Sequence, residues 1–116
     1  GSFVGGVETY YPYREANGRL NSNHAGRRVL VTGMDYPYYS AGYYFASDVD
    51  FTEESLDQPR SEAVDAELFA QARARDFGLI LFQLQDGVLP AGESARGYRL
   101  EKVVRNSAES LAIYAR

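Results

Sequence analysis

Cysteine and tryptophan are absent from this 116-residue chain, and histidine occurs once, at His24. Without a thiol the chain can form no disulfide, use no thiolate nucleophile and offer no cysteine ligand to a metal ion. A site built from two or more histidines is excluded by the same count. The lack of cysteine suits a cytosolic protein and a bacterial extracytoplasmic domain equally.

Long apolar runs and basic clusters are missing as well. No apolar stretch approaches the ~20 residues that a membrane-spanning helix needs, and no signal peptide is recognisable. The net charge is −4, and no stripe of Lys and Arg is present to pair with phosphates, so we expect no nucleic-acid partner. Gly1 and Ser2 are typical of residues left by a cloning vector, which suggests a domain cut from a longer protein.

What remains is ordinary globular composition. Hydrophobic residues make up 45% of the chain and charged residues 24%, which argues against disorder. The length suits one hydrophobic core but not two. We therefore expect residues 3–116 to form a single soluble domain.

A first helix is predicted over residues 10–23. Tyr13, Ala16 and Leu20 fall on one helical face, and the turn-rich stretch from Asn21 to Gly26 would end the helix. Gly18 inside this helix costs about 1 kcal/mol relative to alanine.

Two strands and a loop are predicted next. The β-branched run from Arg28 to Gly33 is typical of a short buried strand. A second, aromatic strand is expected over residues 42–46. The acidic, polar stretch over residues 47–60 is predicted to be a loop with at most one helical turn.

The clearest helix signal lies between Ser61 and Asp76. Ser61 is a suitable N-cap, and Val64, Leu68 and Ala72 form an apolar stripe. Gly78 is expected in the C-cap region of this helix. The apolar run Leu79–Phe82 then predicts a fully buried strand, and the strand–helix–strand order indicates a parallel crossover.

The end of the chain predicts a hairpin. Residues 86–97 hold three glycines and a proline and are expected to form a loop. Residues 99–105 and 111–115 are expected to pair as antiparallel strands, with the alternation in the second typical of a half-exposed sheet. The predicted fold class is α/β, a small mixed sheet with helices packed on it and a C-terminal β-hairpin.

The most distinctive feature is an aromatic segment directly after the first predicted strand. Five of the chain's 10 tyrosines lie between Met34 and Phe45. The end of a strand is where an open α/β sheet places its ligand site, and tyrosine combines an apolar ring with a polar hydroxyl. Three interpretations remain open: core packing, a contact with another domain or a membrane-proximal part, and a ligand platform. The residues expected to form this contact or ligand surface are Asp35, Tyr36, Tyr38, Tyr39, Tyr43 and Tyr44.

No catalytic, cofactor or metal motif is recognisable elsewhere. The residues after Gly33 are bulky, whereas a dinucleotide-binding turn needs further glycines for close approach to a pyrophosphate. Oxygen-bearing side chains alternate from Asp48 to Glu54, but the glycine and the final glutamate of a calcium loop are missing. His24 lies in a turn-rich segment and is expected to be an exposed loop histidine rather than a triad member. We therefore predict no cofactor, no metal and no catalytic residue in this chain.

The order of these segments resembles a known tail domain. "RVLVTG" is followed by a tyrosine-rich stretch, an acidic stretch, a helix ending in "RDFGLILFQ", and a closing "LAIYAR". This order is similar to that of the C-terminal soluble extracytoplasmic domain of bacterial multi-spanning (GT-C type) membrane glycosyltransferases, relatives of protein mannosyltransferases and the lipid A aminoarabinose transferase. The positions that match are Gly33, Asp35, Tyr38 and Tyr39, then Phe77 to Leu81, then Leu111 to Tyr114.

The resemblance covers about residues 10–116 and implies an accessory role. The family's catalytic acid lies in a loop between membrane spans, so the isolated chain should be inactive while its parent transfers sugar from a polyprenyl-phosphate donor. The implied partners are the membrane-embedded part of the same protein and a glycan or lipid-linked sugar. The implied location is extracytoplasmic, tethered to the membrane. Many relatives carry an arginine in the loop after the acid, where this chain has Tyr36 and Pro37, so no role of that arginine is carried over.

Two alternatives remain open at this point. The same tyrosines would suit a free-standing carbohydrate-binding module, because aromatic rings stack on sugars. A small cytosolic α/β enzyme or nucleotide binder is the second alternative, and the missing glycines argue against it.

Overall fold

Five strands form one mixed sheet in the computed structural model, which describes residues 15–33, 50–105 and 110–116. The order across the sheet is β2-β1-β3-β5-β4; β1 runs parallel to β2 and β3, and β5 runs antiparallel to β3 and β4. The α/β fold class and the C-terminal hairpin are therefore confirmed. The strands are β1 (Arg28–Thr32), β2 (Asp50–Glu53), β3 (Leu79–Leu84), β4 (Arg99–Arg105) and β5 (Ser110–Ala115).

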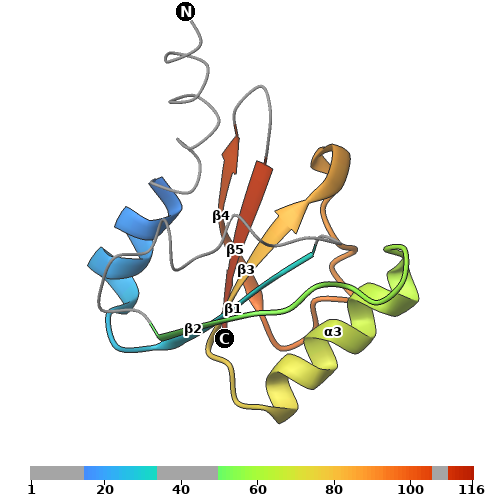
Figure 1. Cartoon of the computed structure of the whole chain (residues 1–116), viewed down its shortest axis with the longest axis horizontal. Coiled ribbons are helices and arrows are strands. Elements are labelled where there is room, and N and C mark those ends of the chain that lie inside the picture. The colour runs from blue at the N-terminus through green and yellow to red at the C-terminus, as the bar shows by residue number, and fades with distance from the viewer. Residues whose placement is uncertain (1–14, 34–49, 106–109) are drawn as a thin grey trace, which may run out of the picture.

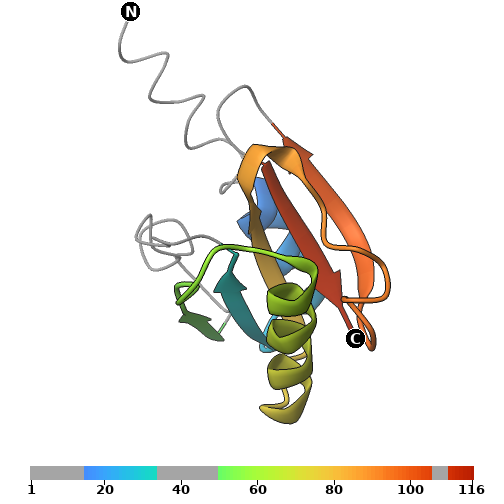
Figure 2. The same cartoon turned by 90° about the vertical axis from the view of Figure 1, so that its right-hand side faces the viewer.

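Helices cover both faces of the sheet (Figure 1). The helical residues 15–24 pack on one face through Ala16 and Leu20, the two residues predicted to share an apolar face. Helix α3 (Glu62–Ala74) packs on the opposite face. The quarter-turned view in Figure 2 shows the strands between these two helical layers. Tyr13, the third residue of the predicted helical face, lies outside the described residues.

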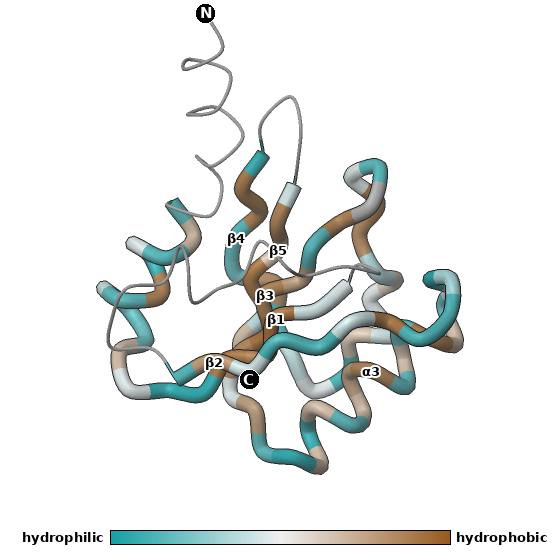
Figure 3. Tube along the Cα trace, in the orientation of Figure 1, coloured by the Kyte–Doolittle hydropathy of each residue, from teal (hydrophilic) through white to brown (hydrophobic). Residues whose placement is uncertain are grey.

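The strand side chains alternate between the two layers, as the pleat of a strand requires. Val29 and Val31 of β1 pack toward residues 15–24, whereas Leu30 packs toward α3. All six residues of β3 are buried, which confirms the prediction of a fully buried strand. The sheet core appears as the brown part of the tube in Figure 3. Covering both faces explains the continuous apolar run Leu79–Phe82 within β3.

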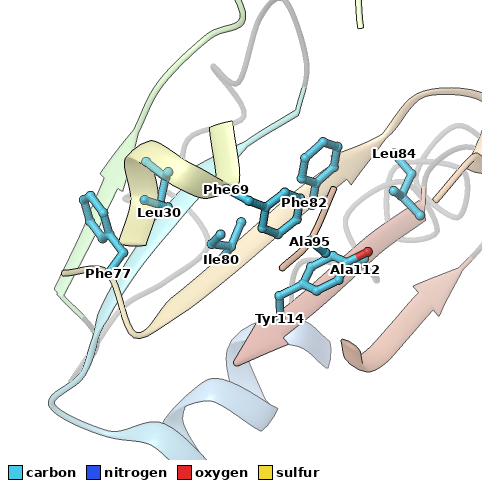
Figure 4. Packing of buried hydrophobic residues seen from close by; sticks show 10 residues of the cluster. Leu30, Phe69, Phe77, Ile80, Phe82, Leu84, Ala95, Ala112 and Tyr114 are labelled. Carbon is cyan, nitrogen blue, oxygen red and sulfur yellow. The ribbon is translucent and has the colours of Figure 1, made fainter. Parts of the chain in front are cut away.

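The core on the α3 face is built around one aromatic side chain, Phe69 (Figure 4). Its ring stacks on Phe82 at a centroid distance of 5.9 Å and meets the ring of Tyr114 edge-on at 5.0 Å. Edge-to-face and offset stacked pairs are the preferred geometries of aromatic rings. One residue of α3 thereby connects β3 and β5.

Both ends of α3 have regular caps, but the C-cap differs from the prediction. Ser61 is the N-cap as predicted, and its hydroxyl accepts a hydrogen bond from the Val64 amide at 3.2 Å. At the other end, Asp76 adopts the left-handed conformation with φ 61°, so the prediction that Gly78 serves the C-cap region is wrong. The Phe77 amide donates to Ala72 O and the Asp76 amide to Arg73 O, which is the Schellman arrangement.

Two further predictions require correction. Residues 50–53, expected within a loop, form the edge strand β2. The sequence of β2 has no strand-like alternation of apolar residues, because Phe51 is its one large apolar residue. An edge strand buries little surface and can form with so few apolar side chains. The half-exposed surface expected for residues 111–115 is also wrong, because β5 lies between β3 and β4 and all five residues are buried.

The remaining segments are short or lie outside the description. A 3₁₀ turn, η1 (Gln85–Gly87), follows β3, and a loop leads from it to β4, as predicted. The aromatic strand expected over residues 42–46 lies outside the described residues. Within the described ranges, no helix is both long and apolar enough to cross a membrane.

Candidate functional site

The six residues predicted to form a contact surface, Asp35, Tyr36, Tyr38, Tyr39, Tyr43 and Tyr44, lie outside the described residues. The structure does describe the point from which their segment leaves the sheet. Thr32 ends β1 and is buried, and Gly33 follows with φ 106°. A Cβ atom on Gly33 would lie 2.6 Å from Gln83 O and 2.7 Å from the Phe82 ring, so glycine is required for this close approach.

The sheet has a topological switch at this point. The chain leaves β1 toward β2 on one side, and it leaves β3 toward β5 and β4 on the other. In open α/β sheets, ligands bind outside the carboxyl ends of strands at such a switch. The described residues thus show that β1 ends at such a switch, while the predicted site residues that follow it lie outside them.

A hollow of about 170 Å³ lies beside this strand end on the α3 face. Its floor is apolar, with Leu30 of β1 and Leu68 and Ala72 of α3. Polar side chains line it as well, among them Arg75 and Glu54, which form an ion pair. The other side chains that line it are Thr32, Ser55, Leu56, Asp57, Gln58, Val64, Glu67 and Gln71.

The charge around this hollow is predominantly negative. Glu54, Asp57 and Glu67 contribute three carboxylates against the single cation of Arg75. The hydrogen bond to Glu54 raises the pKa of Arg75, because it favours the charged guanidinium. The hollow thus offers hydroxyl, amide and carboxylate groups above an apolar floor, a combination suited to a neutral polar group or a cation.

A second polar group, the pair Arg60–Asp65, lies at the start of α3. The Arg60 Nε is 3.1 and 3.2 Å from the two Asp65 carboxylate oxygens, and the side chains are 10% and 4% exposed. Burial raises the pKa of Asp65, an effect that the neighbouring Arg60 charge partly opposes. The guanidinium also lies 5.0 Å from the centre of the Phe82 ring. Arg60, which precedes the N-cap Ser61, is thereby connected both to α3 and to β3.

A third polar group contains the single histidine. His24 ends the helical residues 15–24, and its Nε2 lies 2.8 Å from Glu101 Oε1 of β4. The Arg27 guanidinium donates to His24 Nδ1 at 3.1 Å, and since a guanidinium cannot accept, Nδ1 is the acceptor and Nε2 carries the proton. Both His24 and Glu101 are only 11% exposed, so the prediction of an exposed loop histidine is wrong.

Glu101 reaches His24 because β4 is irregular at this residue. Leu100 pairs with Tyr114 and Lys102 with Ile113, so Glu101 is the extra residue of a β-bulge. Arg19 Nε also donates to Glu101, at 3.0 Å. Burial alone would raise the Glu101 pKa, but the hydrogen bonds from His24 and Arg19 outweigh burial and lower it. Residue 101 is 77 positions from His24, so no local pattern could have predicted this contact.

These three polar groups do different things in the described part of the chain. Within the Arg60–Asp65 pair and within the His24–Glu101 pair, the two side chains bind each other and so connect different segments of the fold. The hollow beside β1 has surfaces that a ligand or a partner can reach. Among the described residues, no group of three or more His, Asp or Glu side chains is placed to hold a metal ion.

Comparison of the chain with models of protein families, with curated proteins and with solved structures gives no match.

Proposed function

We propose that the chain is a non-catalytic extracytoplasmic domain of a polytopic membrane glycosyltransferase that uses a polyprenyl-phosphate sugar donor. In this proposal the parent protein carries the catalytic residues in its membrane-embedded part. The domain packs over that part or guides the acceptor, and the segment from Asp35 to Tyr44 is the contact surface. The location is extracytoplasmic, with the domain tethered by the parent's membrane spans.

The observation that best supports the proposal is the order of elements around the switch of the sheet. A buried central strand ends in Gly33 and leads directly into the tyrosine segment, and α3, β3 and the closing hairpin follow. This is the order on which the resemblance to the glycosyltransferase tail domain depends. The strand that precedes the aromatic segment in the sequence ends at a switch of the sheet, the kind of place at which α/β proteins bind ligands.

The use of charged side chains also favours a binding domain. Asp65 is bound by Arg60 through both carboxylate oxygens, and Glu101 is bound by His24 and Arg19. Each pair joins one secondary-structure element to another. Charged groups that hold the fold together in this way suit a domain whose activity is contact rather than chemistry.

The first test is the reading frame upstream of residue 1. We expect ten or more apolar segments of ~20 residues each, as in a multi-spanning protein. A start codon close to Gly1 would overturn the proposal.

The second test is enzymatic. The full-length parent, reconstituted with a polyprenyl-phosphate sugar, should transfer the sugar, and the isolated chain should not. Deleting residues 3–116 from the parent should lower transfer. Transfer by the isolated chain, or an unchanged rate after the deletion, would contradict an accessory role.

A third measurement separates this proposal from a free-standing sugar-binding module. NMR spectra of the chain would be recorded with millimolar monosaccharide, which detects binding of roughly −4 kcal/mol. Shifts confined to residues 35–44, together with an upstream reading frame that encodes no membrane span, would favour the module.

A further inference from the structure

The outer edge of β4 carries no backbone partner within the described ranges. β4 is the last strand in the order β2-β1-β3-β5-β4, so it pairs with β5 alone. The backbone hydrogen bonds outside regular elements, counted over the described residues, involve none of residues 99–105. An edge of this kind presents unpaired N–H and C=O groups to which an extended peptide can add.

Three of the four charged side chains of β4 are cationic. Arg99, Lys102 and Arg105 are exposed. The one carboxylate of the strand, Glu101, is turned toward Arg19 and His24, which bind it. The edge is therefore positive although the whole chain carries a net charge of −4. A segment that adds to β4 meets cations, so charge complementarity requires an acidic segment.

Two apolar side chains of β4, Leu100 and Val103, lie on the same face as Arg105, whereas Val104 is buried opposite Leu111 on the other face. Leu100 is 41% exposed and pairs with Tyr114, and Val103 is half-buried and pairs with Ala112. Cross-strand partners share a face, so both lie on the α3 side of the sheet. Arg99 and Lys102 pair with Ala115 and Ile113 and lie on the opposite side. A complementary strand presents acidic side chains on the face of Arg99 and Lys102 and apolar side chains on the face of Leu100 and Val103.

A second copy of the chain does not fit this edge. An antiparallel pair of β4 strands centred on the strand places Lys102 opposite Lys102 and Arg99 opposite Arg105. Like charges directly opposite one another are destabilising.

We infer that β4 binds an extended acidic peptide segment of a partner protein, which adds as a further strand beside β4. Main-chain hydrogen bonds provide the contact, Lys102 and its basic neighbours select acidic side chains, and Leu100 and Val103 receive apolar ones. The inference does not depend on the proposed function. The proposed function uses the segment that follows β1, whereas this inference concerns β4 at the far end of the strand order.

The test uses the 116-residue chain and two end-blocked octapeptides. One peptide alternates Glu with Val. The other, the Glu–Pro peptide, holds the same number of glutamates in Glu-Glu-Pro-Pro repeats, which keeps the charge but removes N–H groups from both edges of a strand. We expect the Glu–Val peptide to shift the amide signals of residues 99–105, and the Glu–Pro peptide to bind at least about tenfold more weakly. Equal binding of the two peptides would reduce the contact to charge attraction and overturn strand addition.

Two variants with the same change of charge provide the control. Lys102→Glu should weaken binding of the Glu–Val peptide by about tenfold or more, while Arg96→Glu, in the exposed loop before β4, should leave it within about twofold. Thermal unfolding first checks that both variants fold. Co-sedimentation of the chain with anionic phospholipid vesicles, without any response to the Glu–Val peptide, would identify a lipid surface instead and overturn the inference.

Discussion

Gly33 joins the core of the sheet to the tyrosine segment, and its surroundings leave no room for a side chain. Its φ of 106° lies in the region that side chains rarely adopt. The position of a hypothetical Cβ, 2.6 Å from a backbone oxygen of β3, cannot be relieved by rotating a side chain. Gly18, in the helical residues 15–24, is exposed and has nothing within 4 Å of the same position.

Exchanging each glycine for alanine should therefore have opposite effects. Gly33→Ala combines backbone strain with a core clash, and we expect it to lower the free energy of unfolding by about 2 kcal/mol or more. Gly18→Ala should raise it by about 0.5–1 kcal/mol, because alanine is the better helix former. Urea denaturation of the two variants measures both changes. A Gly33→Ala protein as stable as the parent would contradict the packing described here.

Glu101 is a largely buried carboxylate whose charged form accepts hydrogen bonds from Arg19 and His24. Its lowered pKa means that the folded state favours the carboxylate more than the unfolded state does. Such a group stabilises the protein at pH values above its ordinary pKa, and the contribution is lost as the pH falls through the lowered folded value. Asp65 has a raised pKa and contributes in the opposite direction.

Glu101→Gln should therefore destabilise the protein in a pH-dependent way. We expect a loss of about 1–3 kcal/mol near pH 7, where the carboxylate is charged and accepts from Arg19 and His24. The difference from the parent should shrink as the pH falls from about 5 toward 3. Asp65 is present in both proteins, so its titration cancels in the comparison. A difference that is constant over this range of pH would refute the argument.

The sequence predicted the roles of residues that act on near neighbours, but not the roles of residues whose partners are distant in the chain. Ser61 was predicted as an N-cap because a cap acts within three positions of itself. His24 and Glu101 meet only after β4 has been placed at the edge of the sheet and bulged. The pairing of two residues so far apart depends on topology, and one sequence does not encode it in any local pattern.

At the scale of elements, the two ends of α3 differ in how well their capping residues suit them. Its N-terminus has a favoured cap residue and two acidic residues, Glu62 and Asp65, in the first turn. Its C-terminus ends in a left-handed aspartate, where glycine is the usual choice and a negative charge opposes the helix dipole. The sequence suggested Gly78 for this role because glycine is the common signal.

Asp76→Gly should consequently stabilise the protein, by about 0.5–1 kcal/mol. The ion pair that Asp76 makes with Arg116 is largely exposed, so its loss should cost less than that gain. Asp76→Ala is the matched control, because it removes the same charge but keeps a Cβ in the left-handed conformation. Thermal unfolding of the three proteins should place glycine highest, and an equal gain from alanine would assign the effect to charge alone.

Strong local patterns were sufficient to predict most of the elements. β1, α3, β3 and both strands of the hairpin follow from β-branched runs, helical periodicity and turn residues. β2 was missed because an edge strand buries little and can be mostly polar. The burial of β5 was underestimated because its place between β3 and β4 is a property of the whole sheet. The predicted tyrosine site lies outside the described residues, so that prediction stands as made.

At the scale of the molecule, β5, which comes fifth in sequence order among the described strands, has an interior place in the sheet. β5 pairs with β3 on one side and β4 on the other, so it connects β4 to the parallel strands of the sheet. Its side chains enter both cores: Leu111 and Ile113 face residues 15–24, and Tyr114 faces α3. The N-terminal part of the chain therefore cannot complete either core alone.

Removing residues 110–116 should abolish cooperative unfolding, because these residues include the buried strand β5. Burial of each large apolar side chain contributes about 1.5–3 kcal/mol, and three such side chains plus two ladders of hydrogen bonds approach the 5–15 kcal/mol by which whole domains are stable. We expect the shortened chain to show no sigmoidal thermal transition by circular dichroism. A chain ending at Ala115 is the control and should keep the transition, because Arg116 is exposed. A cooperative transition in the chain that lacks β5 would show that the parallel half of the sheet folds independently.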